Sequence, residues 1–198
     1  FKTSKRYTIL NVVQPRILLG IDPGSNLMGY AFLQLSPKRK PRIVRMGTLD
    51  MRKFKNQGEK LAFIFKELQQ LIKLYEPVEA AIEAPFYGKN VQSMLKLGRA
   101  QGVAMVAVST TGISIEEYAP KTIKRAVTGN GNASKEQVAR MLPHLVEGDM
   151  EGQSEDATDA LGVAFCHHIQ TSGLQVGAKK HKDWNSFLKD NPGRKANL

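Results

Sequence analysis

Four carboxylates in this sequence stand where they could do chemistry. Asp22 and Glu83 each follow a short apolar run that is predicted to be a strand, and Asp156 and Asp159 lie three residues apart at the start of an apolar helix. Residues at that spacing are neighbours on one helix face. Carboxylate oxygens suit Mg²⁺ and Mn²⁺, and two such ions can stabilise both the attacking and the leaving oxygen of a phosphodiester. The four acids therefore predict a divalent-metal site that acts on phosphates.

Each of these acids also has an ordinary explanation. Asp22 precedes Pro-Gly, a common turn sequence, and Asp156 and Asp159 could simply favour a helix N-terminus. Glu83 after an apolar strand is harder to explain in this way. Four carboxylates around one point would raise each other's pKa, and bound cations would relieve that repulsion. The combination, rather than any single acid, supports the metal site.

The charge of the chain is unevenly distributed. The net charge is +11, and residues 1–60 carry 13 Lys/Arg against 3 Asp/Glu. Residues 177–198 carry 6 against 2, whereas residues 61–176 carry 10 against 13. Basic ends favour a polyanionic partner such as nucleic acid. The alternative is a chain whose basic arms touch nothing specific.

Cysteine usage and hydropathy bear on the compartment. The single cysteine, Cys166, excludes an internal disulfide and fits a reducing cytoplasm. Its place in an apolar helix predicts a buried, inert thiol. No apolar run approaches the length of a membrane span, and Gln14-Pro15-Arg16 interrupts the apolar part of the basic start, which makes a poor signal peptide. We expect a cytoplasmic protein without membrane contact.

Hydrophobic periodicity predicts an α/β fold. Three strands form an antiparallel meander, after which helices and strands alternate and three helices follow. The result is a five-stranded mixed sheet with helices on both faces. The expected strands are 17–21, 29–35, 42–49, 78–82 and 113–118, and the expected helices are Gln57–Tyr75, 92–108, Pro120–Thr128, 135–145 and 155–170.

The sequence also bears on helix packing and on domain organisation. Small residues recur in the second helix and predict close packing there; they are Gly98, Ala100, Gly102, Ala104 and Ala107. Residues 17–171 are expected to form one domain, with a basic extension at 1–16 and a basic tail at 172–198.

Four segments resemble the RuvC family, the bacterial Holliday-junction resolvases. They follow one another with family spacing over roughly residues 17–170. They are Ile-Leu-Leu-Gly-Ile-Asp-Pro-Gly-Ser-Asn-Leu-Met-Gly-Tyr at 17–30, Ala-Ile-Glu at 81–83 with Phe86 and Lys89-Asn90, Leu-Lys-Leu-Gly-Arg-Ala-Gln-Gly-Val-Ala at 95–104, and Asp-Ala-Thr-Asp-Ala-Leu at 156–161. The resemblance implies a ribonuclease-H-like fold and a homodimer that makes paired, Mg²⁺-dependent nicks in four-way DNA junctions. It places the catalytic acids at Asp22, Glu83, Asp156 and Asp159.

The resemblance also implies roles for other residues and partners. Phe86 would stack on an unpaired base, Lys89 would contact DNA, and Lys124 and Lys135 would hold or polarise a phosphate. The alternatives are a core phenylalanine and solvated helix charges. Each site would hold two Mg²⁺ ions, for which Mn²⁺ would substitute. A branch-migration motor complex would be a partner in a nucleoid-associated, bacterial-type cytoplasm.

Two rival functions follow from the same residues. Gly-Ile-Asp-Pro-Gly at 20–24 also resembles the first phosphate loop of the actin, Hsp70 and sugar-kinase ATPases. Those proteins need two such domains and a second Gly-rich loop, and this sequence shows no second loop. The other rival is a non-catalytic junction-binding protein. Four intact acids argue against it, because anions facing a phosphate weaken binding unless metal ions intervene.

Overall fold

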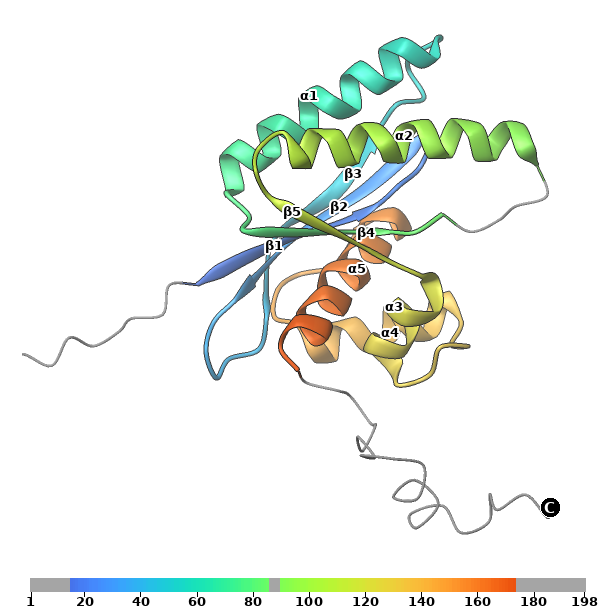
Figure 1. Cartoon of the computed structure of the whole chain (residues 1–198). Coiled ribbons are helices and arrows are strands. Elements are labelled where there is room, and N and C mark those ends of the chain that lie inside the picture. Colours follow the sequence, from blue (N-terminus) through green and yellow to red (C-terminus); the bar gives the residue numbers. More distant parts are fainter. Residues whose placement is uncertain (1–14, 86–89, 174–198) are drawn as a thin grey trace, which may run out of the picture.

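A computed structural model of the chain describes residues 15–85 and 90–173 (Figure 1). Within these residues the elements follow one another in the predicted order. The strands are β1 Arg16–Asp22, β2 Leu27–Leu35, β3 Arg42–Asp50, β4 Glu79–Glu83 and β5 Ser114–Tyr118, and the helices are α1 Gln57–Tyr75, α2 Val91–Ser109, α3 Pro120–Thr128, α4 Lys135–Leu145 and α5 Glu155–Thr171.

The five strands form one mixed sheet in the order β3-β2-β1-β4-β5. β1, β2 and β3 pair in antiparallel fashion, and β1, β4 and β5 pair in parallel. The predicted meander followed by β/α units is therefore confirmed. Since β1 and β4 are parallel neighbours with Ile21 opposite Ile82, their carboxyl ends meet at one edge of the sheet. That edge carries Asp22 and Glu83, the last residues of the two strands.

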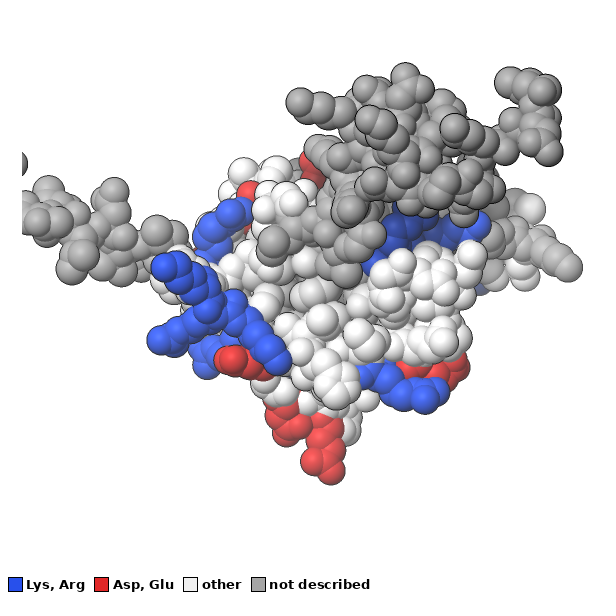
Figure 2. Space-filling model, turned by 90° about the horizontal axis from the view of Figure 1, so that it is seen from below, with Lys and Arg blue, Asp and Glu red and all other residues white. Residues whose placement is uncertain are grey.

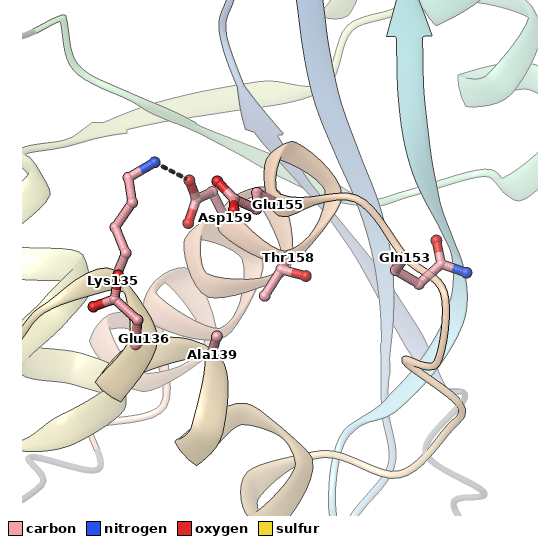
Figure 3. Close-up of a pocket in the computed structure, with 7 residues that line it drawn as sticks. All are labelled: Lys135, Glu136, Ala139, Gln153, Glu155, Thr158 and Asp159. Carbon is pink, nitrogen blue, oxygen red and sulfur yellow. Dashed lines mark hydrogen bonds and ion pairs between the residues drawn. The ribbon is translucent and has the colours of Figure 1, made fainter.

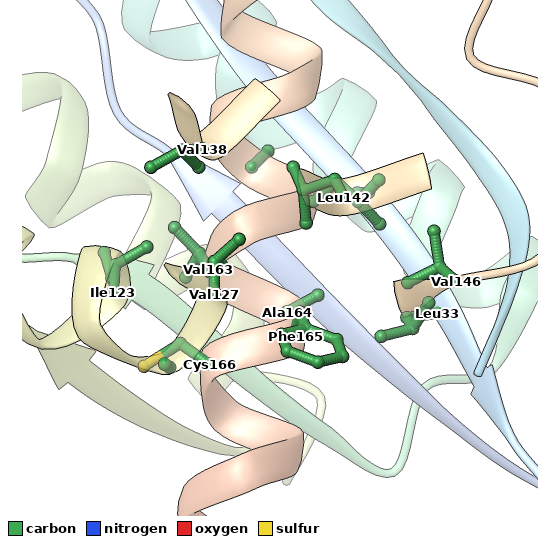
Figure 4. Close-up of a cluster of buried hydrophobic side chains, with 14 of the residues drawn as sticks. Leu33, Ile123, Val127, Val138, Leu142, Val146, Val163, Ala164, Phe165 and Cys166 are labelled. Atoms are coloured by element: carbon green, nitrogen blue, oxygen red, sulfur yellow. The ribbon is translucent and has the colours of Figure 1, made fainter. Parts of the chain in front are cut away.

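Helices cover both faces of the sheet, as predicted. α1 and α2 lie on one face, and α3, α4 and α5 lie on the other (Figure 1). Each face has its own apolar cluster, because alternate strand residues point to opposite sides. Figure 4 shows the cluster under α3, α4 and α5, in which Phe165 of α5 points toward Leu33 of β2 and Cys166 points toward Val127 of α3. The prediction that Cys166 is buried is confirmed.

Two glycines allow α5 to lie directly on the sheet. A Cβ atom on Gly20 of β1 would collide with the carbonyl oxygen of Ala160, and one on Gly29 of β2 would collide with the carbonyl oxygen of Asp156. Backbone atoms cannot move aside as a flexible side chain can. The first two turns of α5 are therefore seated where β1 ends and β2 begins.

The predicted close packing along α2 is seen for its alanines, whereas its glycines lie on an open face of the helix. Ala100, Ala104 and Ala107 are fully buried. Gly98 and Gly102 are exposed, and a Cβ atom on either would meet nothing within 4 Å. The alanines and the glycines occupy different faces of the helix, and only the alanine face packs against the rest of the described chain.

Some boundaries differ from the prediction by one or two residues. β2 begins at Leu27 rather than at residue 29, and β1 and β3 extend to Asp22 and Asp50. The described part of the chain contains no helix that is long and apolar enough to span a membrane. Most of the predicted extension 1–16 and tail 172–198 lies outside the described residues, so the domain division stays a prediction.

Candidate active site

Three of the four predicted acids and both predicted lysines line one cavity. Its volume is about 120 Å³, and we call it the acidic cavity; the lining residues are Asp22, Glu83, Pro120, Ile123, Lys124, Lys135, Val138 and Asp159. The acids come from the ends of two parallel strands and from the second turn of α5. The lysines come from α3 and α4. Residues separated by more than a hundred positions thus converge at one edge of the sheet.

The start of α5 is fixed by its cap. The hydroxyl of Ser154 accepts a hydrogen bond from the backbone N–H of Ala157 at 3.2 Å. The same hydroxyl lies 2.5 Å from the hydroxyl of Thr48 in β3. The cap therefore ties the helix to the sheet as well as beginning it. With the start fixed, Asp159 reaches the acidic cavity.

Asp156 lies at the margin of this group rather than in the lining of the cavity. Its backbone rests on Gly29, and its charge acts on Asp22. The structure therefore brings Asp22, Glu83 and Asp159 into one cavity and places Asp156 beside them.

The two lysines are placed by the starts of their helices. α3 begins with Pro120 at its first turn, and Lys124 lies one turn later. α4 begins with a capping box made by Ser134 and Gln137, and Lys135 is its first residue. The ammonium group of Lys135 donates to a carboxylate oxygen of Asp159 at 2.7 Å (Figure 3). One cation of the chain thus already occupies an oxygen of the acidic group.

Crowding of the acids shifts their protonation. Burial raises the pKa of Asp22 to about 8, and the charges of Glu83, Asp159 and Asp156 add to the effect, while Lys135 opposes it. The pKa of Glu83 is also raised, first by burial and then by the charge of Asp159. Such shifts mean that the negative charge of the site is undercompensated by the chain itself. A cation supplied from outside would restore the balance.

The donor set fits a hard divalent cation in its chemistry. The cavity offers carboxylate oxygens and no sulfur or imidazole, which is the preference of Mg²⁺ and Mn²⁺. Among residues 15–85 and 90–173, however, no three His, Cys, Asp or Glu side chains stand close enough to form a ready ligand group. The residues for a metal site are assembled, but the ligand set is not closed in this structure.

A second cavity of about 290 Å³ adjoins the first between α4 and α5 (Figure 3). Lys135 and Asp159 line both cavities, and Gln153 and Thr158 line only the second. Sequence reasoning did not single out Gln153, Thr158, Thr48 or the seating glycines. Thr158 is adjacent to Asp159 in the Asp-Ala-Thr-Asp segment at 156–159. That position was the one signal in the sequence that could have indicated a place for Thr158 in the site.

Two predicted DNA contacts cannot be placed. Phe86 and Lys89 lie outside the described residues, between Glu83 at the end of β4 and Asn90, the cap of α2. Their predicted roles stay predictions.

Comparison with known proteins agrees with this arrangement. A sequence model of the family described as crossover junction endodeoxyribonuclease RuvC matches residues 18–167. The RuvC crossover junction endodeoxyribonuclease of Bacteroides fragilis is 50% identical over 188 residues, which are 94% of this chain and 99% of that protein. The corresponding protein of Porphyromonas gingivalis is 50% identical over 183 residues, covering 90% of this chain and 96% of the other.

Solved structures show the same fold. Thermus thermophilus RuvC in complex with a Holliday junction substrate superposes with a TM-score of 0.73 at 24% identity, covering 79% of this chain and 94% of that one. The yeast mitochondrial Holliday junction resolvase Ydc2 superposes with a TM-score of 0.62 at 15% identity, covering 81% and 82%. The predicted ribonuclease-H-like fold is confirmed, and the ATPase and non-catalytic alternatives gain no support. The chain belongs to the RuvC family of crossover junction endodeoxyribonucleases.

Proposed function

We propose that this chain cuts four-way DNA junctions by metal-dependent hydrolysis of phosphodiesters at the acidic cavity. The observation that carries the proposal is the convergence of three carboxylates and two lysines on one cavity, where the pKa of Asp22 is raised to about 8. The chain is an endonuclease by family, and the RuvC family is metal-dependent. Identity of 50% over 94% of the chain supports the same substrate as that of the curated relatives.

The acids hold the metal in this proposal. Asp22, Glu83 and Asp159 are the ligands within the cavity, and Asp156 completes the set from its margin. These residues would hold Mg²⁺, which when bound would activate water and neutralise charge on the leaving oxygen, a task suited to two ions. Mn²⁺ would substitute because it takes the same oxygen ligands. The sheet edge and the cap of α5 keep the carboxylates in place while the phosphate enters.

The lysines bind and orient the phosphate. Lys124 lines the cavity and places a positive charge on its wall, and that charge opposes the rise that burial causes in the pKa of Glu83. Lys135 donates to Asp159 in this structure, and its ammonium group would be free to donate to a phosphate oxygen if Asp159 served as a metal ligand instead. Both lysines would stabilise the charge that builds up on the phosphate during cleavage.

A homodimer supplies the second site. Two symmetric nicks need two active sites related by a two-fold axis. On α2 an apolar and small-residue stripe follows helical spacing and is left uncovered by the described chain; we call Val91, Leu95, Gly98, Gly102 and Val106 the α2 stripe. Val91, Leu95 and Val106 are 68%, 50% and 54% exposed. The two glycines would let a second copy approach the helix closely. We infer that the α2 stripe faces the partner subunit.

Sedimentation tests the dimer. Leu95→Arg places a charge in the α2 stripe, whereas Leu74→Arg places one on an apolar residue of α1 that is also exposed, at 69%. We expect the Leu95 variant to sediment as a monomer and the Leu74 variant to sediment as the wild-type dimer. A dimeric Leu95 variant would move the interface elsewhere.

We also propose that a branch-migration motor complex is a partner of this chain and that the chain acts in a bacterial cytoplasm. Bacterial relatives support the setting. The single cysteine is a free, buried thiol, and burial raises its pKa to about 12. A chain with one such thiol contains no internal disulfide, which fits a reducing compartment.

Incubation with a synthetic four-way junction and Mg²⁺, beside linear duplex of the same sequence, tests the function. We expect the wild type to nick the junction and to leave the duplex intact. Asp22→Asn should bind the junction without nicking it. Asp149→Asn, which changes an exposed acid outside the cavity, should nick as the wild type does. Binding without nicking by the wild type would make the chain a junction binder, and hydrolysis of ATP would favour the ATPase alternative.

A further inference from the structure

Four cations gather where β3 passes into α1. Arg52, Lys53, Lys55 and Lys60 lie within nine residues, and we call them the β3–α1 basic cluster. The first three are exposed, and Lys60 is half-buried. The cluster belongs to residues 1–60, which carry 13 Lys/Arg against 3 Asp/Glu. None of its four residues lines the acidic cavity.

The β3–α1 basic cluster lies at the same sheet edge as the acidic cavity. Asp50, the last residue of β3, pairs with Leu27, and Gly29 in the same strand pairs with Asp22. Neighbouring strands lie about 4.8 Å apart, so two spacings separate β3 from β1 by about 10 Å. Figure 1 shows the β3–α1 connection on the same side of the molecule as the end of β4 and the start of α5.

Hydrogen bonds join the β3–α1 basic cluster to the turn that follows Asp22. The backbone N–H of Met51 donates to the carbonyl oxygen of Asn26 at 2.8 Å, and the ammonium group of Lys60 donates to the side-chain oxygen of Asn26 at 2.6 Å. The guanidinium of Arg52 has its pKa raised first by its bond with Asp50 and then also by the charge of Asp156. The cluster and the catalytic acids are therefore parts of one continuous surface.

Two of the cations are held in place before any ligand arrives. Arg52 donates to Asp50 from Nε at 3.0 Å and from Nη2 at 2.6 Å. The ammonium group of Lys53 lies 4.7 Å from the ring centre of Phe63 and 5.2 Å from that of Phe54. A side chain that is already ordered loses less conformational entropy on binding. The cluster is suited to hold an anion at a fixed place.

We propose that the β3–α1 basic cluster binds the phosphates of one duplex arm of the junction, beside the scissile phosphate. The proposal rests on the proposed function and adds where an arm lies. Backbone contacts of this kind set the register of the DNA and read no sequence. Single-strand binding would need rings free to stack on bases, and here the two phenylalanine rings face Lys53 and each other.

The chain offers a matched control at the opposite end of β2. Lys38, Arg39 and Lys40 lie in the β2–β3 turn, whereas the β3–α1 basic cluster lies beyond the other end of the same strands. The nine residues of β2 separate the two ends by about 30 Å. Figure 2 shows cations gathered on the side of the molecule where the β2–β3 hairpin turns.

The test compares two double variants of the full chain in junction binding at increasing salt. Lys53→Gln with Lys55→Gln removes two cations of the β3–α1 basic cluster, and Lys38→Gln with Arg39→Gln removes two control cations. Each lost phosphate contact lowers the slope of log affinity against log salt by about 0.9. The slope for the cluster variant should be shallower than that for the wild type by about 1.8. Between 50 and 200 mM salt, the affinity of the wild type should therefore fall about 12-fold more than the affinity of the cluster variant. Phosphate ethylation of the bound arm should interfere with binding of the wild type and should cease to interfere in the cluster variant.

Other outcomes assign the failure. An unchanged slope in the cluster variant, or an equal change in the control variant, would overturn the proposal while leaving the proposed function intact. Junction binding without nicking by the wild type would overturn the proposed function alone. Nicking at saturating protein should survive in both variants because the acidic cavity is untouched.

Discussion

Replacing Asp22 by Asn should stabilise the metal-free protein at pH 8 and abolish cleavage. Burial, and then the charges of Glu83, Asp159 and Asp156, raise the pKa of Asp22 from 3.8 to about 8. Between these pH values the native protein retains a proton that the unfolded chain has released. The carboxyl therefore makes a contribution to stability that declines as the pH rises from about 4 to about 8. Asn carries no such proton, so the variant escapes the decline.

The size of the effect follows from the shift. One pKa unit corresponds to about 1.36 kcal/mol, so the full span sets an upper limit of about 5 kcal/mol at pH 8. Solvent reaches the acidic cavity and Lys135 offsets part of the repulsion. We therefore expect the variant to gain about 2–3 kcal/mol over the wild type at pH 8, and about 1 kcal/mol at pH 5.

Urea unfolding in the presence of a chelator measures this difference. Wild type, Asp22→Asn and the control Asp149→Asn would be unfolded at pH 5 and at pH 8. Added Mg²⁺ should then stabilise the wild type at pH 8 more than the Asp22 variant, because a ligand stabilises the state that binds it. A difference between wild type and Asp22→Asn that does not grow with pH would refute the raised pKa and the reasoning built on it.

Three further predictions concern the same site. Lys135→Met should raise the affinity for Mg²⁺ severalfold in calorimetry and slow nicking, because the lysine competes for an oxygen of Asp159; weaker metal binding would contradict that competition. Gly29→Ala should lower stability by about 1–3 kcal/mol in thermal unfolding, because its methyl group would meet the carbonyl oxygen of Asp156; an unchanged midpoint would count against the close seat of α5. Ca²⁺ should support junction binding and fail to support nicking, because it accepts loose coordination with more ligands than Mg²⁺; rapid nicking in Ca²⁺ alone would speak against the proposed site.

Local signals explain which parts of the fold were predictable. α1 and α3 have the predicted bounds because apolar spacing defines the first and Pro120 opens the second. The capping box at Ser134 fixed the start of α4 in the same way. β2 begins earlier than predicted because its first residue, Leu27, pairs with Asp50 at the far end of the neighbouring strand β3. A pairing partner of that kind leaves no mark in the local sequence.

The site was predictable in its acids and not in its contacts. Asp22 and Glu83 could be placed because each ends a strand, and parallel neighbours bring their ends together. The bond between Lys135 and Asp159 joins residues 24 positions apart and depends on how α4 crosses α5. The open face at Gly98 was also beyond prediction, because periodicity shows that a helix has faces without showing what covers each of them.

The acids are held together by contacts in which they take no part. Gly20 and Gly29 seat α5, Ser154 caps it, and the β1–β4 pairing aligns the strand ends. The packing energy of the fold thereby offsets the burial and the repulsion that together raise the pKa of Asp22. Asp22→Asn, which relieves the repulsion, should therefore stabilise the protein. Gly29→Ala, which loosens the packing of α5 on the sheet, should destabilise it, although both changes should end cleavage. Acids that merely favoured a helix N-terminus would show the opposite sign, since removing them would cost stability.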